Sequence, residues 1–283
     1  MIERAGQILK EQGHNLTVAP TTGPRVAGAI AREHIEQGAD LIVVAGGDGT
    51  INEAAEGMVG SRVPLAILPG GTANVLAMEM KLGGNLERVA RRMPELVPRR
   101  ISVGQLTFEG SEVSRYFLLM AGVGLDAHVV YKVHAGLKAK TGKFAYWVAG
   151  WSLLGKKLAE FDVEIGGQKR RCSFALLSKV RNYGGDFEIA RSVTLMDEEF
   201  EAILFEGATS TRYVKYFAGM ALNTLSGMSG VTVIRAGEIR IGAPTDQRAY
   251  IQIDGELAGH LPAELKIVRD ALTVLAPETH GQR

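Results

Sequence analysis

The sequence has little of what marks several large classes of protein. Its 283 residues include one cysteine, Cys172, which excludes an intrachain disulfide and favours a reducing compartment. The net charge of +1 gives no indication of a nucleic-acid-binding protein. The most apolar stretch, residues 144–154, is shorter than the roughly 20 residues that span a bilayer, and the amino terminus lacks a signal-peptide pattern. We therefore expect a cytoplasmic protein with no transmembrane segment and no nucleic-acid partner.

Glycine, by contrast, is abundant, and many of the 35 glycines follow predicted strands. Residues 41–44 are apolar and rich in β-branched side chains, which is typical of a buried strand in a parallel sheet. The sequence GGDGT follows at 46–50, and residues 51–59 have a helical pattern. Thr50 and Glu53 have the spacing of a capping box, so we expect Thr50 to be the helix N-cap. Such a unit directs backbone N–H groups toward an anion such as phosphate.

A second unit of the same kind lies downstream. Residues 65–68 form another apolar run, and PGGTANVLA at 69–77 reads as a glycine turn followed by a helix. In open α/β sheets, ligands bind at the carboxyl ends of the strands. We therefore expect the two glycine turns to lie at the same edge of one sheet.

The pattern of elements changes near residue 97. Before it, helices are predicted at 2–12 and 26–35, and a strand at 16–19. After it, short alternating strands dominate, with hairpin turns expected at Gly166-Gly167 and Ala236-Gly237. The predicted strands are 101–107, 115–121, 161–165, 171–177, 200–206, 231–235, 237–241 and 249–253, and helical segments interrupt them near 126–134, 143–158 and 210–225.

These patterns predict two domains. Residues 1–97 are expected to form an α/β domain, and residues 98–283 a β-sandwich or barrel with inserted helices. An α/β nucleotide-binding domain usually opens with a strand and a glycine turn. This chain opens with a helix, so we expect the first strand of the domain to be missing.

Five motifs occur in an order that resembles one known family. They are GGDGT followed by Ile51-Asn52-Glu53, then PGGTAN, GVGLDA at 122–127, NYGGDFEIA at 182–190 and IDGE at 253–256. Together they resemble the diacylglycerol kinase catalytic-domain family, which includes bacterial lipid kinases, sphingosine kinases and ceramide kinases. NAD kinases and 6-phosphofructokinases share a GGDG-type turn, but PGGTAN followed by a β-rich domain with IDGE fits the lipid kinases better. The resemblance implies a three-layer α/β domain followed by a β-rich domain.

The resemblance also implies that ATP is bound. Thr21 is explained equally well as a loop threonine in a local turn, and Asn74 either caps its helix or touches phosphate. Because a carboxylate repels phosphate unless Mg²⁺ lies between them, Asp48 implies a metal ion. The residues expected at the nucleotide are Thr21, Gly46, Gly47, Asp48, Gly49, Thr50, Asn52, Glu53, Gly71, Thr72 and Asn74.

Four acidic residues are candidates for catalysis. On its own, Asp254-Gly255 predicts a hairpin turn. The resemblance instead implies that Asp254 is the general base, with Glu256 also important. In sphingosine kinases the base is the aspartate of GGDGT, here Asp48, so both assignments stay open. Asp126 follows a strand-like run, where it is either a helix cap or, as the resemblance implies, an active-site residue.

A structural Mg²⁺ site is a further implication of the resemblance. The metal would be bound by the carboxylate of Asp197 and by the backbone carbonyls of Phe200 and Ala202. The family commonly has glycine after this aspartate. Here Glu198 follows it, which departs from the pattern.

The sequence offers one segment for lipid contact. Residues 143–158 place Phe144, Trp147 and Trp151 on one helical face, which either packs in the core or meets lipid. The resemblance predicts an ATP- and Mg²⁺-dependent lipid kinase that phosphorylates a hydroxyl of a diacylglycerol-like or related lipid at the inner face of the membrane. The alternatives are a kinase of a soluble metabolite such as NAD and a catalytically silent nucleotide- or lipid-binding homologue. The sequence leaves the lipid and the formation of a homo-oligomer open.

Overall fold

The computed structural model describes residues 1–124, 158–183, 187–209, 211–221, 224–244 and 248–278. The chain forms two compact units, Met1–Val103 with Val268–Arg283, and Gly104–Ile267. Two long strands, β3 (Leu96–Phe108) and β16 (Ala263–Pro277), contribute residues to both units. The boundary expected at residue 97 therefore falls inside β3. The chain also returns to the first unit after Ile267, because β16 continues as one strand whose second half pairs with a strand of that unit.

The first unit contains a short parallel sheet. Strands β1 (Ile42–Gly46) and β2 (Leu65–Pro69) pair in parallel, with Ile42 opposite Leu65 and Gly46 opposite Pro69. On its other side β2 pairs in parallel with β16. All five residues of β2 are buried, as expected for a strand inside a parallel sheet. The two strands predicted from the apolar runs at 41–44 and 65–68 are confirmed.

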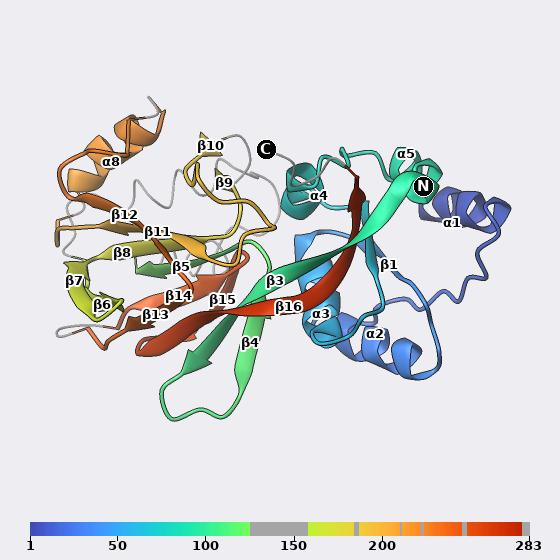
Figure 1. Cartoon of the computed structure of the whole chain (residues 1–283), viewed down its shortest axis with the longest axis horizontal. Coiled ribbons are helices and arrows are strands. Elements are labelled where there is room, and N and C mark those ends of the chain that lie inside the picture. The colour runs from blue at the N-terminus through green and yellow to red at the C-terminus, as the bar shows by residue number, and fades with distance from the viewer. Residues whose placement is uncertain (125–157, 184–186, 210, 222–223, 245–247, 279–283) are drawn as a thin grey trace. The chain divides into compact units, whose positions relative to one another are not determined.

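Helices pack against this sheet and against each other. Helix α2 (Ala27–Glu36) lies beside α3 (Asp48–Met58), and α1 (Ile2–Glu11) contacts α5 (Leu86–Arg91), as Figure 1 shows. The short helix α4 (Val75–Glu79) follows β2, and a 3₁₀ turn spans Met93–Glu95. A Cβ atom on Gly57 would collide with the backbone of Gly28, so glycine at both positions permits the close contact of α2 with α3.

The strand predicted at residues 16–19 is wrong. These residues have no regular secondary structure, and Val18 is 75% exposed. A short apolar run gains little from the extended conformation when no neighbouring strand pairs with it. Among the described residues, β1 therefore pairs with β2 alone.

The second unit contains a six-stranded antiparallel sheet in the order β12-β11-β8-β5-β14-β15. A second group of strands pairs as β16-β13-β6-β7, and β4 pairs with β3. The bounds are β4 Ser114–Phe117, β5 Met120–Gly124, β6 Phe161–Ile165, β7 Gln168–Cys172, β8 Phe174–Ser178, β11 Phe200–Phe205, β12 Val231–Ala236, β13 Glu238–Ile241, β14 Tyr250–Ile253 and β15 Glu256–His260. The remaining described elements are β9 (Asn182–Tyr183), β10 (Phe187–Glu188) and α8 (Thr211–Ala221).

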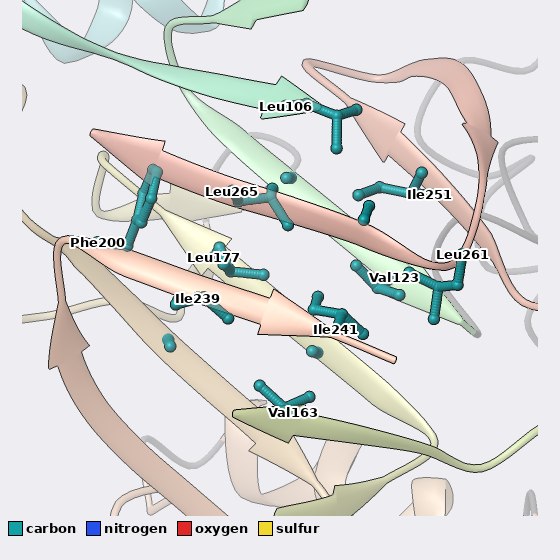
Figure 2. Packing of buried hydrophobic residues seen from close by; sticks show 14 of the residues in the cluster. Leu106, Val123, Val163, Leu177, Phe200, Ile239, Ile241, Ile251, Leu261 and Leu265 are labelled. Carbon is teal, nitrogen blue, oxygen red and sulfur yellow. The ribbon is translucent and has the colours of Figure 1, made fainter. Parts of the chain in front are cut away.

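Apolar side chains from both groups of strands share one core. Ile239 and Leu265 belong to the same buried cluster as Val123 and Leu177 of the six-stranded sheet, and Figure 2 shows them close together. The rings of Phe117 and Phe200 stack within this cluster, with centroids 5.7 Å apart. The β-sandwich predicted for the second half of the chain is confirmed.

The turns between strands were predicted with mixed success. Gly166 and Gly167 join β6 to β7 with positive φ angles of 57° and 76°, which confirms that hairpin. The hairpin predicted at Ala236-Gly237 is wrong, because β12 pairs with β11 whereas β13 pairs with β6 and β16. That connection leads from one sheet to the other.

The predicted strands 115–121 and 171–177 each form two strands. The helices predicted at 126–134 and 143–158 lie outside the described residues, apart from residue 158.

Candidate functional site

The GGDGT segment forms the junction between β1 and α3. The helix begins at Asp48, and its N-cap is Gly47 in an extended conformation (φ −86°, ψ 177°). The N–H group of Ile51 donates to the carbonyl oxygen of Gly47 at 3.1 Å. The prediction that Thr50 is the N-cap is therefore wrong, since the N-cap lies three residues earlier, at Gly47, which has no side chain that could cap the helix. Asp48, Gly49 and Thr50 all lie in the first turn, whose N–H groups have no acceptor within the helix.

The two glycine turns are in direct contact. The N–H group of Gly70 donates to the carbonyl oxygen of Gly46 at 2.9 Å. A Cβ atom on Gly71 would come within 2.5 Å of the Cα atom of Gly47. The expectation that both turns lie at one edge of the sheet is confirmed, and this contact requires the absence of a side chain at residue 71.

Asn74 holds the second turn in shape. Its Oδ1 atom accepts a hydrogen bond from Gly71 N at 2.8 Å, and its Nδ2 atom donates to Gly71 O at 2.8 Å. Asn74 stands at the N-cap position of α4 with a positive φ of 49°, but its side chain makes no capping hydrogen bond. The buried amide thus fixes the Gly71 peptide, while the neighbouring Thr72 is exposed.

Two acidic residues of the GGDGT segment have different surroundings. The Oδ1 atom of Asp48 accepts a long hydrogen bond, 3.4 Å, from the N–H group of Leu76 in α4. The carboxylate of Glu53 accepts from Arg25 N at 2.8 Å and from Ala27 N at 3.3 Å. Glu53 therefore stabilises the entry to α2 rather than forming the capping box expected with Thr50. Of the other residues expected at the nucleotide, Thr21 is exposed and Asn52 is buried.

In the second unit, Asp254 and Gly255 form the turn between β14 and β15, with positive φ angles of 47° and 84°. This confirms the hairpin that the Asp-Gly pair predicts. The carboxylate of Asp254 accepts hydrogen bonds from three consecutive N–H groups, those of Leu118 at 2.7 Å, Leu119 at 2.9 Å and Met120 at 2.9 Å. The side chain is thereby held in one orientation.

The other two candidate catalytic carboxylates, those of Glu256 and Asp126, are less well defined by the structure. Glu256 lies 3.9 Å from the guanidinium group of Arg115, and both side chains are partly exposed. Asp126 lies outside the described residues.

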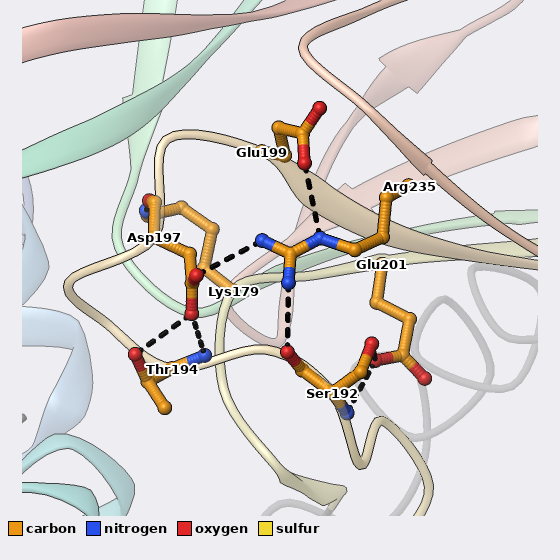
Figure 3. Close-up of polar contacts among 7 residues, drawn as sticks. All are labelled: Lys179, Ser192, Thr194, Asp197, Glu199, Glu201 and Arg235. Atoms are coloured by element: carbon orange, nitrogen blue, oxygen red, sulfur yellow. Dashed lines mark hydrogen bonds and ion pairs between the residues drawn. The ribbon is translucent and has the colours of Figure 1, made fainter. Parts of the chain in front are cut away.

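Asp197 is surrounded by hydrogen-bond donors of the protein (Figure 3). Its Oδ2 atom accepts from the backbone N–H of Thr194 at 2.6 Å and from the hydroxyl of Thr194 at 2.8 Å. Its Oδ1 atom accepts from Arg235 at 2.9 Å. Burial raises the pKa of Asp197, but the hydrogen bonds from Arg235 and Thr194 outweigh it and hold the pKa below its ordinary value.

The ligands expected for a structural Mg²⁺ do not fit this arrangement. The guanidinium group of Arg235 binds the carboxylate of Asp197, and Lys179 Nζ binds its backbone carbonyl oxygen. Ala202 pairs with strands on both of its sides, so its peptide belongs to the sheet, and Phe200 pairs with Ala236 of β12. Within the described residues, no cluster of three or more His, Cys, Asp or Glu side chains could hold a metal ion.

Sequence reasoning missed three polar residues of this region. Lys179 follows the apolar strand β8, and Arg235 and Glu201 lie within predicted strands. Glu201 is buried and accepts hydrogen bonds from Ser192 N at 2.7 Å and Arg191 N at 3.1 Å. A charged residue in or directly after an apolar strand is the signal that could have identified them.

Comparisons with known proteins agree with this fold. Residues 1–106 match the family model described as "Diacylglycerol kinase catalytic domain", and residues 120–276 match "YegS C-terminal NAD kinase beta sandwich-like domain". A diacylglycerol kinase of Bacillus subtilis (strain 168) is 26% identical over 283 residues, which cover 98% of this chain and 91% of the relative. A diacylglycerol kinase of Mycobacterium tuberculosis (strain ATCC 25618 / H37Rv) is 25% identical over 252 residues, 87% of this chain and 80% of the relative.

A solved structure shares the same fold. The crystal structure of a diacylglycerol kinase from Bacillus anthracis str. Sterne has a TM-score of 0.74 at 20% sequence identity. The superposition covers 99% of this chain and 90% of the other.

Among the described residues, no helix has the length and apolar character needed to cross a membrane.

Proposed function

We propose that this chain transfers the γ-phosphoryl group of ATP to a hydroxyl of a diacylglycerol-like lipid. The chain belongs to the family that joins a diacylglycerol kinase catalytic domain to a YegS-type C-terminal domain, and it is a lipid kinase. The observation that carries the proposal is the contact between the two glycine turns at the carboxyl ends of β1 and β2. Glycine at 47 and 71 lets the two turns meet, so the first turn of α3 and the Gly71 turn adjoin at the edge where open α/β sheets bind ligands.

We assign the phosphates of ATP to the first turn of α3 and to the adjoining turn at Gly71. The N–H groups of that first turn, which have no acceptor within the helix, and the positive end of the helix dipole favour negative charge. Asp48 would hold the Mg²⁺ that accompanies ATP, since its Oδ2 atom has no hydrogen-bond partner among the described residues. Bound there, the ion would neutralise phosphate charge.

The reaction is a direct transfer. The oxygen of the lipid hydroxyl bonds to the γ-phosphorus as the bond from that phosphorus to the β–γ bridging oxygen breaks, and ADP leaves. The hydroxyl proton passes to a carboxylate, because a general base near the attacking oxygen accepts the proton late in a loose transition state. Asp254 is our first candidate, since three backbone N–H groups fix its orientation. Asp48 remains the second candidate, and Glu256 and Asp126 are proposed as supporting residues.

The decisive test is transfer of labelled γ-phosphate from ATP to a panel of acceptors. The panel contains diacylglycerol, ceramide and sphingosine in mixed micelles, with NAD as a soluble acceptor. Labelled phosphatidic acid is the expected product. Labelling of NAD alone would overturn the lipid assignment, and nucleotide binding without any labelled product would support the silent homologue.

A further inference from the structure

The guanidinium group of Arg235 binds three residues of the segment 192–199, which precedes β11. Arg235 donates to Asp197 Oδ1 at 2.9 Å, to Glu199 Oε2 at 3.0 Å and to the carbonyl oxygen of Ser192 at 2.9 Å. Figure 3 shows the guanidinium group between these three acceptors. Two carboxylates and one carbonyl thus converge on a single positive group, which is the kind of ligand set that a hard divalent cation binds.

A second cation reaches the same loop from the buried side. Lys179 is fully buried, and its Nζ atom donates to the carbonyl oxygen of Asp197 at 3.0 Å. A buried ammonium is costly unless acceptors and negative charge surround it. Burial lowers the pKa of Lys179 to about 8, and the negative charges of Asp197 and Glu198 offset only part of this effect. Glu198 is the residue that replaces the glycine of the family pattern.

We propose that Lys179 and Arg235 replace the divalent cation that the family resemblance implies at Asp197, so that this loop is held without a metal ion. Both carboxylate oxygens of Asp197 already accept hydrogen bonds from Thr194 and Arg235. A divalent ion at this carboxylate would lie next to the guanidinium group and repel it. The inference concerns the fold of the second unit and does not depend on the proposed phosphoryl transfer.

Thermal unfolding of the nucleotide-free full chain tests the proposal. The Tm is measured in EDTA and in millimolar MgCl₂ or CaCl₂, with NaCl of matched ionic strength as the reference. A cation present at about 100 times its Kd would raise the Tm by several degrees. We expect no such rise that depends on Asp197. A rise in the wild-type chain that Asp197→Asn abolishes would overturn the proposal.

A second comparison keeps the test decisive if Asp197→Asn does not fold. A divalent-specific rise that Asp48→Asn abolishes assigns the ion to the GGDGT turn and agrees with the proposal. A rise that survives in Asp48→Asn contradicts it.

Substitution of two arginines separately tests whether the guanidinium group of Arg235 stabilises this loop. Arg235→Met removes the guanidinium group from the loop, whereas Arg240→Met, on β13, removes exposed surface pairs with Glu238 and Glu264. We expect a Tm loss of several degrees for Arg235→Met and about 1 °C or less for Arg240→Met. Equal losses in the two variants would refute the assignment of Arg235.

Discussion

The backbone N–H of Leu119 donates a hydrogen bond of 2.9 Å to Oδ1 of Asp254. The carbonyl oxygen of the same residue accepts from the N–H of Lys179 at 2.8 Å. One residue at the entry to β5 therefore connects the hairpin turn that carries our first candidate base to the lysine that contacts Asp197. Substitutions at Asp254 should accordingly affect stability as well as turnover.

Asp254→Asn should lower turnover by about 10²- to 10⁴-fold, because the amide cannot accept the hydroxyl proton. The amide NH₂ group would also face one of the backbone N–H donors, so the stability should fall by about 1–3 kcal/mol. Lipid phosphorylation at saturating ATP and urea unfolding measure the two effects. Asp162→Asn, at an exposed position of β6, is the matched control. Near-normal turnover of a folded Asp254→Asn variant would exclude Asp254 as the general base.

Gly71→Ala should weaken ATP binding by at least about tenfold, since the new Cβ would lie 2.5 Å from Gly47 Cα and would force the two glycine turns apart. Gly84→Ala is the control, because a Cβ there meets nothing within 4 Å. Calorimetric titration with ATP compares the two variants. Unchanged affinity in Gly71→Ala would remove this turn from the nucleotide site.

The thiol of Cys172 should be unreactive in the folded protein. Burial raises the pKa of Cys172 far above its ordinary value, with a smaller contribution from Glu206, and the side chain is fully buried. The thiolate is the reactive form. We expect labelling by a disulfide reagent to follow global unfolding, with full reaction in denaturant as the control. Labelling of the native chain on mixing would contradict the burial of this residue.

Stability should rise with pH in the window set by Lys179. Burial lowers the pKa of Lys179 from 10.5 to about 8, against the opposing effect of Asp197 and Glu198. Between these values the unfolded chain carries a proton that the folded chain has lost, so the free energy of unfolding increases with pH. The full contribution is at most about 3 kcal/mol.

Urea unfolding at about pH 7.5 and 9.5, for the wild type and for Lys179→Met, isolates this effect. The wild type should gain stability relative to the variant at the higher pH. All other titrating groups are common to both chains, so a pH-independent difference between them would show that the pKa of this lysine is not lowered.

Local sequence signals predicted the part of the candidate site that lies in the first unit. An apolar run followed by glycines and a helical pattern places each βα turn correctly, because all of the information lies within a few residues. The start of α3 was misplaced since Thr50 and Glu53 have a capping spacing, yet Glu53 binds backbone N–H groups of Arg25 and Ala27. These two N–H groups lie 28 and 26 positions before Glu53, so the residues around Glu53 do not reveal that its carboxylate binds them instead of capping its own helix.

Long-range contacts account for what the sequence did not reveal in the second unit. The donors to Asp254 lie 134 to 136 positions earlier in the chain, so the Asp-Gly pair predicts the hairpin but not the fixed carboxylate. Arg235 and Asp197 are 38 positions apart, and each is unremarkable in its own segment. The metal site at Asp197 was expected from a resemblance in one loop, whereas Arg235 and Lys179, which contact Asp197, lie in or beside other strands.

The return of β16 to the first unit affects the order in which the chain can fold during synthesis. Residues 104–267 are contiguous and leave the ribosome before Val274, which pairs with Leu65 of β2. The β-sandwich can therefore form on the nascent chain while the sheet of the first unit still lacks a strand. The sheet of the first unit is therefore completed only after the residues of the β-sandwich have been synthesised.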